Sequence, residues 1–229
     1  MPFSGLEERV AEIRGRIEAA VQRGGHGQSV RLIAVTKTHG ADAVDAAWDA
    51  GLRDVGENKV QETLDKLPLV APRAAAMRWH LIGHLQRNKV KHLGHFALLH
   101  SMDSGRLADA VNEFGVARGT PMDVLVQVNI VGETTKGGYE PSMLAEEAAR
   151  LKRLSGLRVL GVMTMAPFEA SEATLRTVFR GARAARDVLR QAGHPATELS
   201  MGMSGDYEMA VEEGATMVRV GTVLFGARA

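Results

Sequence analysis

The chain of 229 residues contains no cysteine, and aromatic residues make up only 4% of it. Without cysteine there is no disulfide framework, no thiolate zinc site and no cysteine nucleophile. Basic and acidic residues nearly balance, 28 against 27, so no positive excess points to a nucleic-acid partner. No apolar run approaches the roughly 18 residues that a membrane span needs. We therefore expect a soluble protein without nucleic-acid or membrane partners, compatible with a cytoplasmic location.

The first 25 residues are rich in charge and lack the apolar core of a signal peptide. Their apolar residues recur at steps of three and four, at Leu6, Val10, Ile13, Ile17 and Val21. This spacing places them on one face of a helix, so we expect an N-terminal amphipathic helix.

From residue 31 onward, apolar strand-like runs alternate with helical patterns. The expected strands are 31–37, 53–57, 78–83, 96–102, 122–130, 157–165, 198–201 and 216–221. Seven of them are followed by an expected helix, at 41–51, 58–67, 84–94, 104–119, 141–156, 171–193 and 205–214. This alternation indicates a parallel sheet, and eight such units favour a (β/α)₈ barrel, a fold that typically takes about 250 residues. An open doubly wound sheet is the alternative. No linker divides residues 1–229, so we expect one barrel domain with an extra N-terminal helix.

In such a barrel the active site forms where the strands end on their carboxyl side. Polar and small residues gather at the expected strand ends: Lys37, Glu57, Asn58, His80, Gly83, His100, Ser101, Asn129, Met163, Thr164, Ser200, Gly202, Arg219, Gly221 and Thr222. The strand interiors are almost wholly apolar, so convergence of these groups predicts a ligand site at this end.

Lys37 is the only lysine at the end of an expected strand, between Thr36 and Thr38. It is either a solvated lysine leaving the sheet or a partly desolvated amine that condenses with an aldehyde. The hydroxyls of the two threonines would direct such an amine. From its position alone, Lys37 fits an aldolase as well as a pyridoxal phosphate protein.

Two clusters of small residues follow the last two strands, at 200–205 and at Gly221-Thr222. The loops after strands seven and eight of a barrel often bind phosphate through backbone N–H groups. Ser200 and Thr222 would add hydroxyl donors. Ordinary turn chemistry is the alternative, and we favour a phosphate site.

Several stretches, in order, resemble one known family. AVTKT (34–38), GENKVQE (56–62), WHLIGHLQRNK (79–89), LGVMTMAP (160–167) and the segment 199–228 are similar to pyridoxal phosphate homeostasis proteins, also described as alanine-racemase N-terminal-domain-like. The resemblance runs from about residue 6 to the C-terminus. It implies a barrel of the alanine racemase type that holds pyridoxal 5′-phosphate as a Schiff base on Lys37, and a part in vitamin B6 homeostasis.

The resemblance also assigns roles around the cofactor. It puts Asn58 beside the ring, Ser200, Gly221 and Thr222 at the phosphate, and Arg219 at the pyridine nitrogen. We add His80, Met163 and Gly202 to the expected cofactor-binding residues, since they stand at the same strand ends. An arginine keeps the ring nitrogen unprotonated and so weakens the ring as an electron sink. A rim ion pair, for example with Glu57, is the alternative for Arg219.

Racemisation needs two bases on opposite faces of the ring, and beside Lys37 no second one is convincing. Tyr139 and Tyr207 are the only tyrosines, and neither is expected to act as acid or base. We therefore expect a carrier without catalytic residues, which buffers pyridoxal phosphate or delivers it to apo-enzymes by transient contact. The resemblance suggests a monomer. A minimal racemase or decarboxylase, and a cofactor-free lyase of phosphorylated sugars, are the alternatives.

Five histidines crowd the stretch 80–100. His80 and His84 are four residues apart, as zinc ligands on a helix can be. Gly83 interrupts the helix between them and no carboxylate lies there, so we expect no metal site. His80 is expected to shape the cofactor pocket instead.

Overall fold

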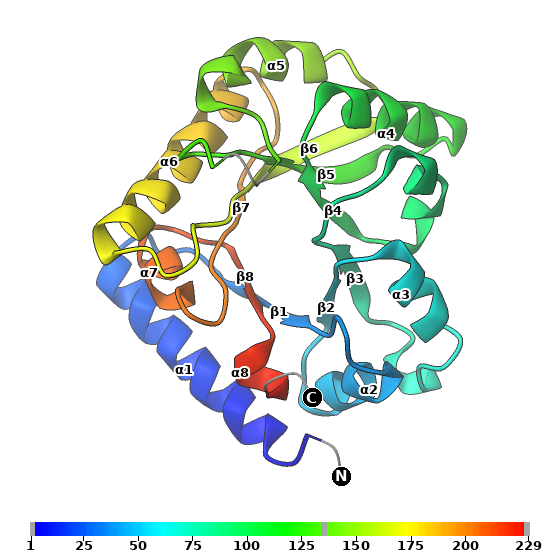
Figure 1. Ribbon diagram of the computed structural model, residues 1–229, viewed down its shortest axis with the longest axis vertical. Coiled ribbons are helices and arrows are strands. Elements are labelled where there is room, and N and C mark those ends of the chain that lie inside the picture. The colour runs from blue at the N-terminus through cyan, green and yellow to red at the C-terminus, as the bar shows by residue number, and fades with distance from the viewer. Residues whose placement is uncertain (1–2, 134–136, 227–229) are drawn as a thin grey trace.

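The computed structural model describes residues 3–133 and 137–226 and contains a closed barrel of eight parallel strands (Figure 1). The strands pair in chain order, and the first also pairs with the last. They are β1 (Arg31–Val35), β2 (Asp54–Glu57), β3 (Arg78–Leu81), β4 (Leu98–Met102), β5 (Met122–Gln127), β6 (Leu157–Met163), β7 (Glu198–Ser200) and β8 (Met217–Val220). The expected (β/α)₈ barrel is confirmed, and the open sheet is wrong because β1 and β8 close the ring.

Helices surround the strands on the outside (Figure 1). They are α1 (Leu6–Gly24), α2 (Ala41–Asp49), α3 (Val60–Lys66), α4 (Gly105–Ala117), α5 (Leu144–Leu151), α6 (Glu172–Gln191), α7 (Tyr207–Glu212) and α8 (Thr222–Phe225). Three 3₁₀ segments join them: η1 (Pro72–Ala74), η2 (Arg87–His95) and η3 (Pro141–Met143). No helix within the described ranges is both long and apolar enough to pass through a lipid bilayer.

The apolar core lies in two parts, because each strand presents alternate residues to the two faces of the sheet. The larger part fills the space between sheet and helices. The smaller part lies inside the barrel and consists of Ile33, Leu98, Leu125, Met163 and Met217. Since this inner cluster is small, the remaining inward positions are free for the polar side chains described below.

The N-terminal helix α1 packs its apolar face onto the barrel, as its spacing predicts. Leu6, Val10, Ile13 and Ile17 are buried, and Gly25 ends the helix in a left-handed conformation with φ of 67°. The helix lies beside α7 and α8 (Figure 1). Because α8 has only four residues, α1 covers the part of the sheet that a full eighth helix would cover.

Several expected element boundaries are wrong. The expected helix 84–94 is the 3₁₀ segment η2. Its buried residues Val90 and Leu93 lie three apart, the period of a 3₁₀ helix, and buried Phe96 follows its end. The expected helix 141–156 begins as η3 and ends at Leu151. Gly156 lies beyond it because its Cα meets the backbone of α4: a Cβ there would be 2.0 Å from the Asn112 carbonyl oxygen.

Candidate functional site

The carboxyl ends of the strands form one mouth, where the expected site residues from neighbouring strands gather. Lys37 follows β1, Asn58 follows β2, and Arg219 lies in β8, which pairs with β1 through Ile33. Lys37 and Asn58 are half-buried and Arg219 is buried. Three adjacent strands therefore carry the amine, the amide and the guanidinium to the same end of the barrel.

Arg219 is a buried cation that donates hydrogen bonds to neutral acceptors. Its Nη1 donates to Ser200 Oγ at 2.6 Å and its Nη2 to the Thr164 carbonyl oxygen at 3.0 Å, and 4% of the residue is exposed. Burial lowers the pKa of Arg219 to about 10, so the guanidinium stays charged at neutral pH. No ion pair to a carboxylate is found for it in the described part of the chain. The alternative of an ion pair with Glu57 is therefore wrong.

Glu57 instead pairs with a second buried amine, Lys66 of α3. Lys66 Nζ lies 2.7 Å from Glu57 Oε1 and 2.8 Å from the Thr36 carbonyl oxygen, and Thr36 Oγ1 donates to the same carboxylate oxygen at 2.6 Å. Burial raises the pKa of Glu57, and the hydrogen bonds from Lys66 and Thr36 oppose that rise. The sequence analysis missed Lys66; its spacing from buried Val60 and Thr63 by steps of three was the available signal.

The backbone around Lys37 is held in an unusual conformation. Thr38 has φ of 68°, a left-handed value that a β-branched residue rarely adopts. Its N–H donates to Glu62 Oε2 at 3.2 Å, and the His39 N–H donates to the Thr36 carbonyl oxygen at 3.1 Å. The hydroxyl of Thr36 donates to Glu57, and its part in directing Lys37 stays a prediction. The turn and the Lys66 contact fix the Lys37 backbone.

The loops after β7 and β8 meet at a serine that the sequence analysis did not select. Ser204 Oγ accepts a hydrogen bond from the Gly221 N–H at 3.3 Å. Ser200, selected as a phosphate ligand, is fully buried and has its hydroxyl between Arg219 and His100. Ser204 therefore lies beside Gly221 at the half-buried edge of the mouth, while Ser200 belongs to the barrel interior. Thr222, the first residue of α8, is exposed at the same edge.

Gly202 has a packing requirement of its own. Its φ is 91°, and a Cβ there would lie 2.6 Å from Ala210 Cβ and 2.9 Å from Tyr207 Cα. Glycine at this position lets α7 approach the loop after β7. Met163 lies in the inner apolar cluster and forms part of the floor beneath the mouth. The roles of both residues toward a cofactor stay predictions.

His80 lies inside the barrel. Its Nε2 is 2.8 Å from Asp54 Oδ1, and its Nδ1 is 2.9 Å from His100 Nε2. His84, by contrast, is exposed and pairs with Asp103. The two histidines thus contact different partners, and no group of three metal-ligating side chains occurs within 3–133 and 137–226.

The two tyrosine side chains have different surroundings. Tyr139 donates its hydroxyl to Glu147 of α5 at 2.8 Å, and burial together with this bond raises its pKa. Tyr207 is buried in the outer core with the Arg16 guanidinium of α1 5.7 Å from its ring centre, and burial raises its pKa. A raised pKa makes each phenol a weaker base catalyst at neutral pH.

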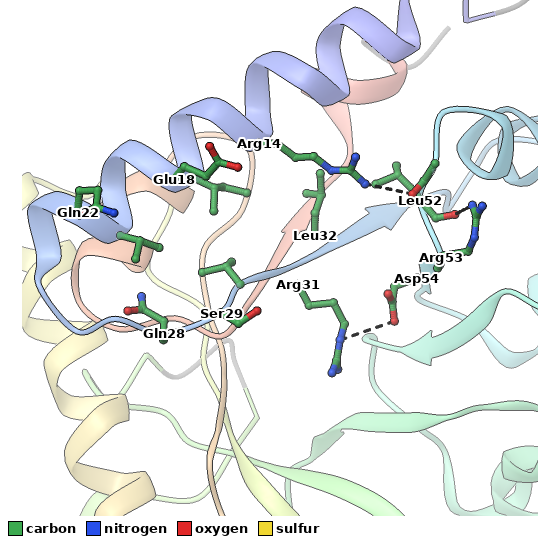
Figure 2. A pocket seen from close by; sticks show the side chains of 14 residues that line it. Arg14, Glu18, Gln22, Gln28, Ser29, Arg31, Leu32, Leu52, Arg53 and Asp54 are labelled. Atoms are coloured by element: carbon green, nitrogen blue, oxygen red, sulfur yellow. Dashed lines mark hydrogen bonds and ion pairs between the residues drawn. The ribbon is translucent and has the colours of Figure 1, made fainter.

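A hollow of about 500 Å³ lies at the opposite end of the barrel, where β1 and β2 begin (Figure 2). Arg14, Arg31, Arg53, Glu18 and Asp54 are among its lining residues. The arginines have partners there: Arg14 donates to the Gly51 carbonyl, Arg53 to two carbonyls, and Arg31 lies 4.0 Å from Asp54. This mixed and paired lining makes the hollow a poorer candidate than the mouth, despite its size.

The model of the alanine racemase N-terminal domain family matches residues 9–229. A protein of Aquifex aeolicus named pyridoxal phosphate homeostasis protein is 42% identical over 96% of this chain and 97% of its own length. One of the same name from Pseudomonas aeruginosa is 41% identical over 99% of this chain and 97% of its own. The chain belongs to the pyridoxal phosphate homeostasis protein family.

A solved member of the family, PipY of Synechococcus elongatus with PLP bound, has the same fold. It is 37% identical, with a TM-score of 0.84, and the match covers 96% of this chain and all of that one. The resemblance read from the sequence is therefore confirmed for the family and for the barrel type. The residue-by-residue roles in the family's site stay predictions for this chain.

Proposed function

We propose that this protein binds pyridoxal 5′-phosphate at the barrel mouth and buffers or delivers it within the cell. The names of its relatives and the PLP-bound PipY structure support this function. In this proposal residues 1–229 form one cofactor-binding barrel domain, which acts as a monomer in the cytoplasm and meets recipient apo-enzymes only transiently.

The observation that carries the proposal is the buried Arg219 guanidinium. Its side chain contacts a hydroxyl and a carbonyl, and it has more N–H donors than these two acceptors use. A buried cation without a contacting carboxylate favours a ligand that brings an acceptor, such as an unprotonated ring nitrogen. The same cation disfavours a proton on that nitrogen, because two adjacent positive charges repel.

The other donors around the mouth suit the rest of this cofactor. Lys37 offers an amine to the aldehyde, and Asn58 on the neighbouring strand offers an amide to the ring. Ser204 and Thr222 offer hydroxyl donors to the phosphate beside Gly221, whose own N–H donates to Ser204 Oγ. When bound, pyridoxal phosphate supplies an aldehyde that reacts with amines and a ring that withdraws electrons.

A carrier fits these residues better than an enzyme. Arg219 favours the unprotonated ring, the weaker electron sink; the Tyr139 hydroxyl is bound to Glu147, and Tyr207 packs in the outer core. A racemase or decarboxylase stays the alternative, because the matching family model is named for alanine racemase.

Binding is tested by titrating the protein with pyridoxal phosphate and following the absorption spectrum. We expect a shifted band with wild type and with the matched control Lys59→Ala, which removes the lysine just before α3. Lys37→Ala should leave the spectrum of free cofactor. An unshifted spectrum with wild type, or a shifted one with Lys37→Ala, would refute the binding site.

Carrier and enzyme are separated by incubating the loaded protein with each L-amino acid in deuterium oxide. We expect no exchange of the α-proton above the rate given by free pyridoxal phosphate. Exchange with turnover rates of about 1 per second or more, the range of ordinary enzymes, would establish the catalytic alternative.

A further inference from the structure

Five inward-facing side chains form a continuous chain of hydrogen bonds through the barrel, from the mouth to its other end. Ser200 Oγ lies 2.6 Å from Arg219 Nη1 and 2.8 Å from His100 Nδ1. His100 Nε2 lies 2.9 Å from His80 Nδ1, and His80 Nε2 lies 2.8 Å from Asp54 Oδ1. Arg219, Ser200, His100, His80 and Asp54 are each buried. We name these five residues the core chain.

The direction of every hydrogen bond in the core chain follows from its two ends. Asp54 is ionised: burial would raise its pKa, but hydrogen bonds from Arg78 and His80 outweigh burial and lower it to about 2. A carboxylate only accepts, so His80 donates through Nε2–H. At the other end an arginine only donates, so Ser200 accepts from Arg219.

The two histidines between these ends are neutral, because burial lowers the pKa of both. A neutral imidazole has one N–H and one acceptor nitrogen. Since His80 donates through Nε2, its Nδ1 accepts, and His100 must donate through its own Nε2–H. The Nδ1 of His100 then accepts a hydrogen bond from the Ser200 hydroxyl. Every bond therefore donates from the mouth toward Asp54.

The competing arrangement reverses the middle of the core chain. A protonated His80 would donate through both ring nitrogens and force the His100 proton onto Nδ1, toward Ser200. Positive charges near the histidines disfavour this protonation. Arg31 of β1 and Arg78 of β3 lower the pKa of His80, and Arg219 of β8 lowers the pKa of His100. Only Asp54 favours a proton on His80.

We infer that His100 and His80 are positioning residues that fix the guanidinium of Arg219. The core chain makes Ser200 an acceptor toward Arg219, because its single proton is committed to His100. Together with the Thr164 carbonyl, this acceptor holds one edge of the guanidinium and leaves its other donors for a ligand. Packing of the barrel interior does not need these polar residues, since apolar side chains fill it in the inner cluster beside them. The ligand part of this inference rests on the proposed function.

The tautomers are tested in cofactor-free protein by long-range proton–nitrogen spectra with ¹⁵N-labelled histidine, between about pH 6 and 8. We expect neutral Nε2–H rings with exchange-protected protons at positions 80 and 100, assigned by their loss in His80→Gln and His100→Gln. His194, which is buried and has its Nε2 2.9 Å from the Ala148 carbonyl oxygen, gives the reference signal. An Nδ1–H tautomer at His100, or a charged His80 at neutral pH, would overturn the direction of the core chain.

The positioning role is tested by pyridoxal phosphate titration of His100→Gln beside the matched control His194→Gln. We expect at least about tenfold weaker binding and a displaced absorption maximum in His100→Gln, the scale of losing one buried bond to a charged group. The control should match wild type in both. Unchanged affinity and spectrum in His100→Gln would refute the role. If wild type itself fails to bind, the proposed function falls, while the tautomer spectra still decide the core chain.

Should His100→Gln fail to fold by circular dichroism, Asp54→Asn replaces it in the titration. Asparagine keeps an acceptor oxygen but removes the charge that fixes the direction of donation. We expect this variant to bind pyridoxal phosphate more weakly than wild type and to show a displaced absorption maximum. A spectrum and affinity equal to wild type in this folded variant would count against the inference.

Discussion

Two buried charge clusters occupy the same barrel and are built differently. In the first, Lys66 and Glu57 touch at 2.7 Å, and the ammonium also binds the carbonyl of the residue before Lys37. In the second, the cation Arg219 and the anion Asp54 are separated by the three neutral side chains of the core chain. The cation of the first cluster contacts its anion directly, whereas Arg219 contacts no carboxylate among the described residues and Asp54 pairs with Arg78 instead.

This difference separates a structural task from a binding task. A contact pair uses its charges on each other, so Lys66 and Glu57 hold the backbone on which Lys37 stands. A cation kept apart from its anion retains donors for a ligand acceptor. The following variants test this division, from the largest expected effect on stability to the smallest.

Breaking the contact pair by Lys66→Met should lower the free energy of unfolding by about 3 to 5 kcal/mol, because it leaves the Glu57 carboxylate buried and uncompensated. Urea denaturation of cofactor-free protein measures the loss. The double variant Lys66→Met with Glu57→Leu should recover most of it. If the single variant is as stable as wild type, the pair is not structural.

Replacing the charged end of the core chain by Asp54→Asn should lower the free energy of unfolding by on the order of 2 kcal/mol at neutral pH. Solvent around the exposed Arg78 screens the Asp54 charge and makes this loss smaller. The folded pKa of Asp54, about 2, lies below its unfolded value of about 3.9. This stabilisation is therefore complete above about pH 5 and is lost as the pH falls through the folded pKa of about 2. Wild-type and variant unfolding curves, measured across this window, should converge at its acid end; a constant difference would contradict the assignment.

Arg219→Met should change the stability of the cofactor-free protein by no more than about 1 kcal/mol, because the cation it removes has no contacting carboxylate to leave behind. Its affinity for pyridoxal phosphate should nevertheless fall at least about a hundredfold. Thermal unfolding and spectral titration on the same samples measure both. A large loss of stability would mean that Arg219 serves the barrel rather than a ligand.

The smallest effect is expected at the turn after Lys37. Thr38→Gly relieves the left-handed strain of a β-branched residue but adds backbone entropy to the unfolded chain, so a net gain of about 0.5 to 1 kcal/mol is expected. Thr36→Gly, a neighbouring position without positive φ, should destabilise instead. A loss of stability in Thr38→Gly would show that the threonine side chain outweighs the strain.

The barrel could be predicted from the sequence because its strands and helices carry their own periodicity. The alternation of apolar runs with helical patterns gave the strand order, and the strand ends gave Lys37, Asn58 and Arg219 at one mouth. Boundaries failed where tertiary contacts decide them, as at Gly156, which must pass close to α4.

The partners of the polar residues could not be predicted in the same way. Residue type indicates that Arg219 needs acceptors, but only the barrel's register shows that Ser200 rather than Glu57 supplies one. His100 was predicted to lie at a strand end, but its hydrogen bonds to His80 and Ser200 depend on the side-chain directions on three strands. A lysine near the end of a helix, such as Lys66, would be expected at the surface, but the structure shows that it is buried.

The most direct test of the proposed function is chemical mapping of the cofactor link. The protein is incubated with pyridoxal 5′-phosphate, reduced with borohydride and digested, and the modified peptides are identified by mass spectrometry. The account predicts one dominant adduct on Lys37 in wild type, and its loss in Lys37→Ala. A dominant adduct on Lys66, Lys59 or any other amine, or no adduct at all, would contradict it.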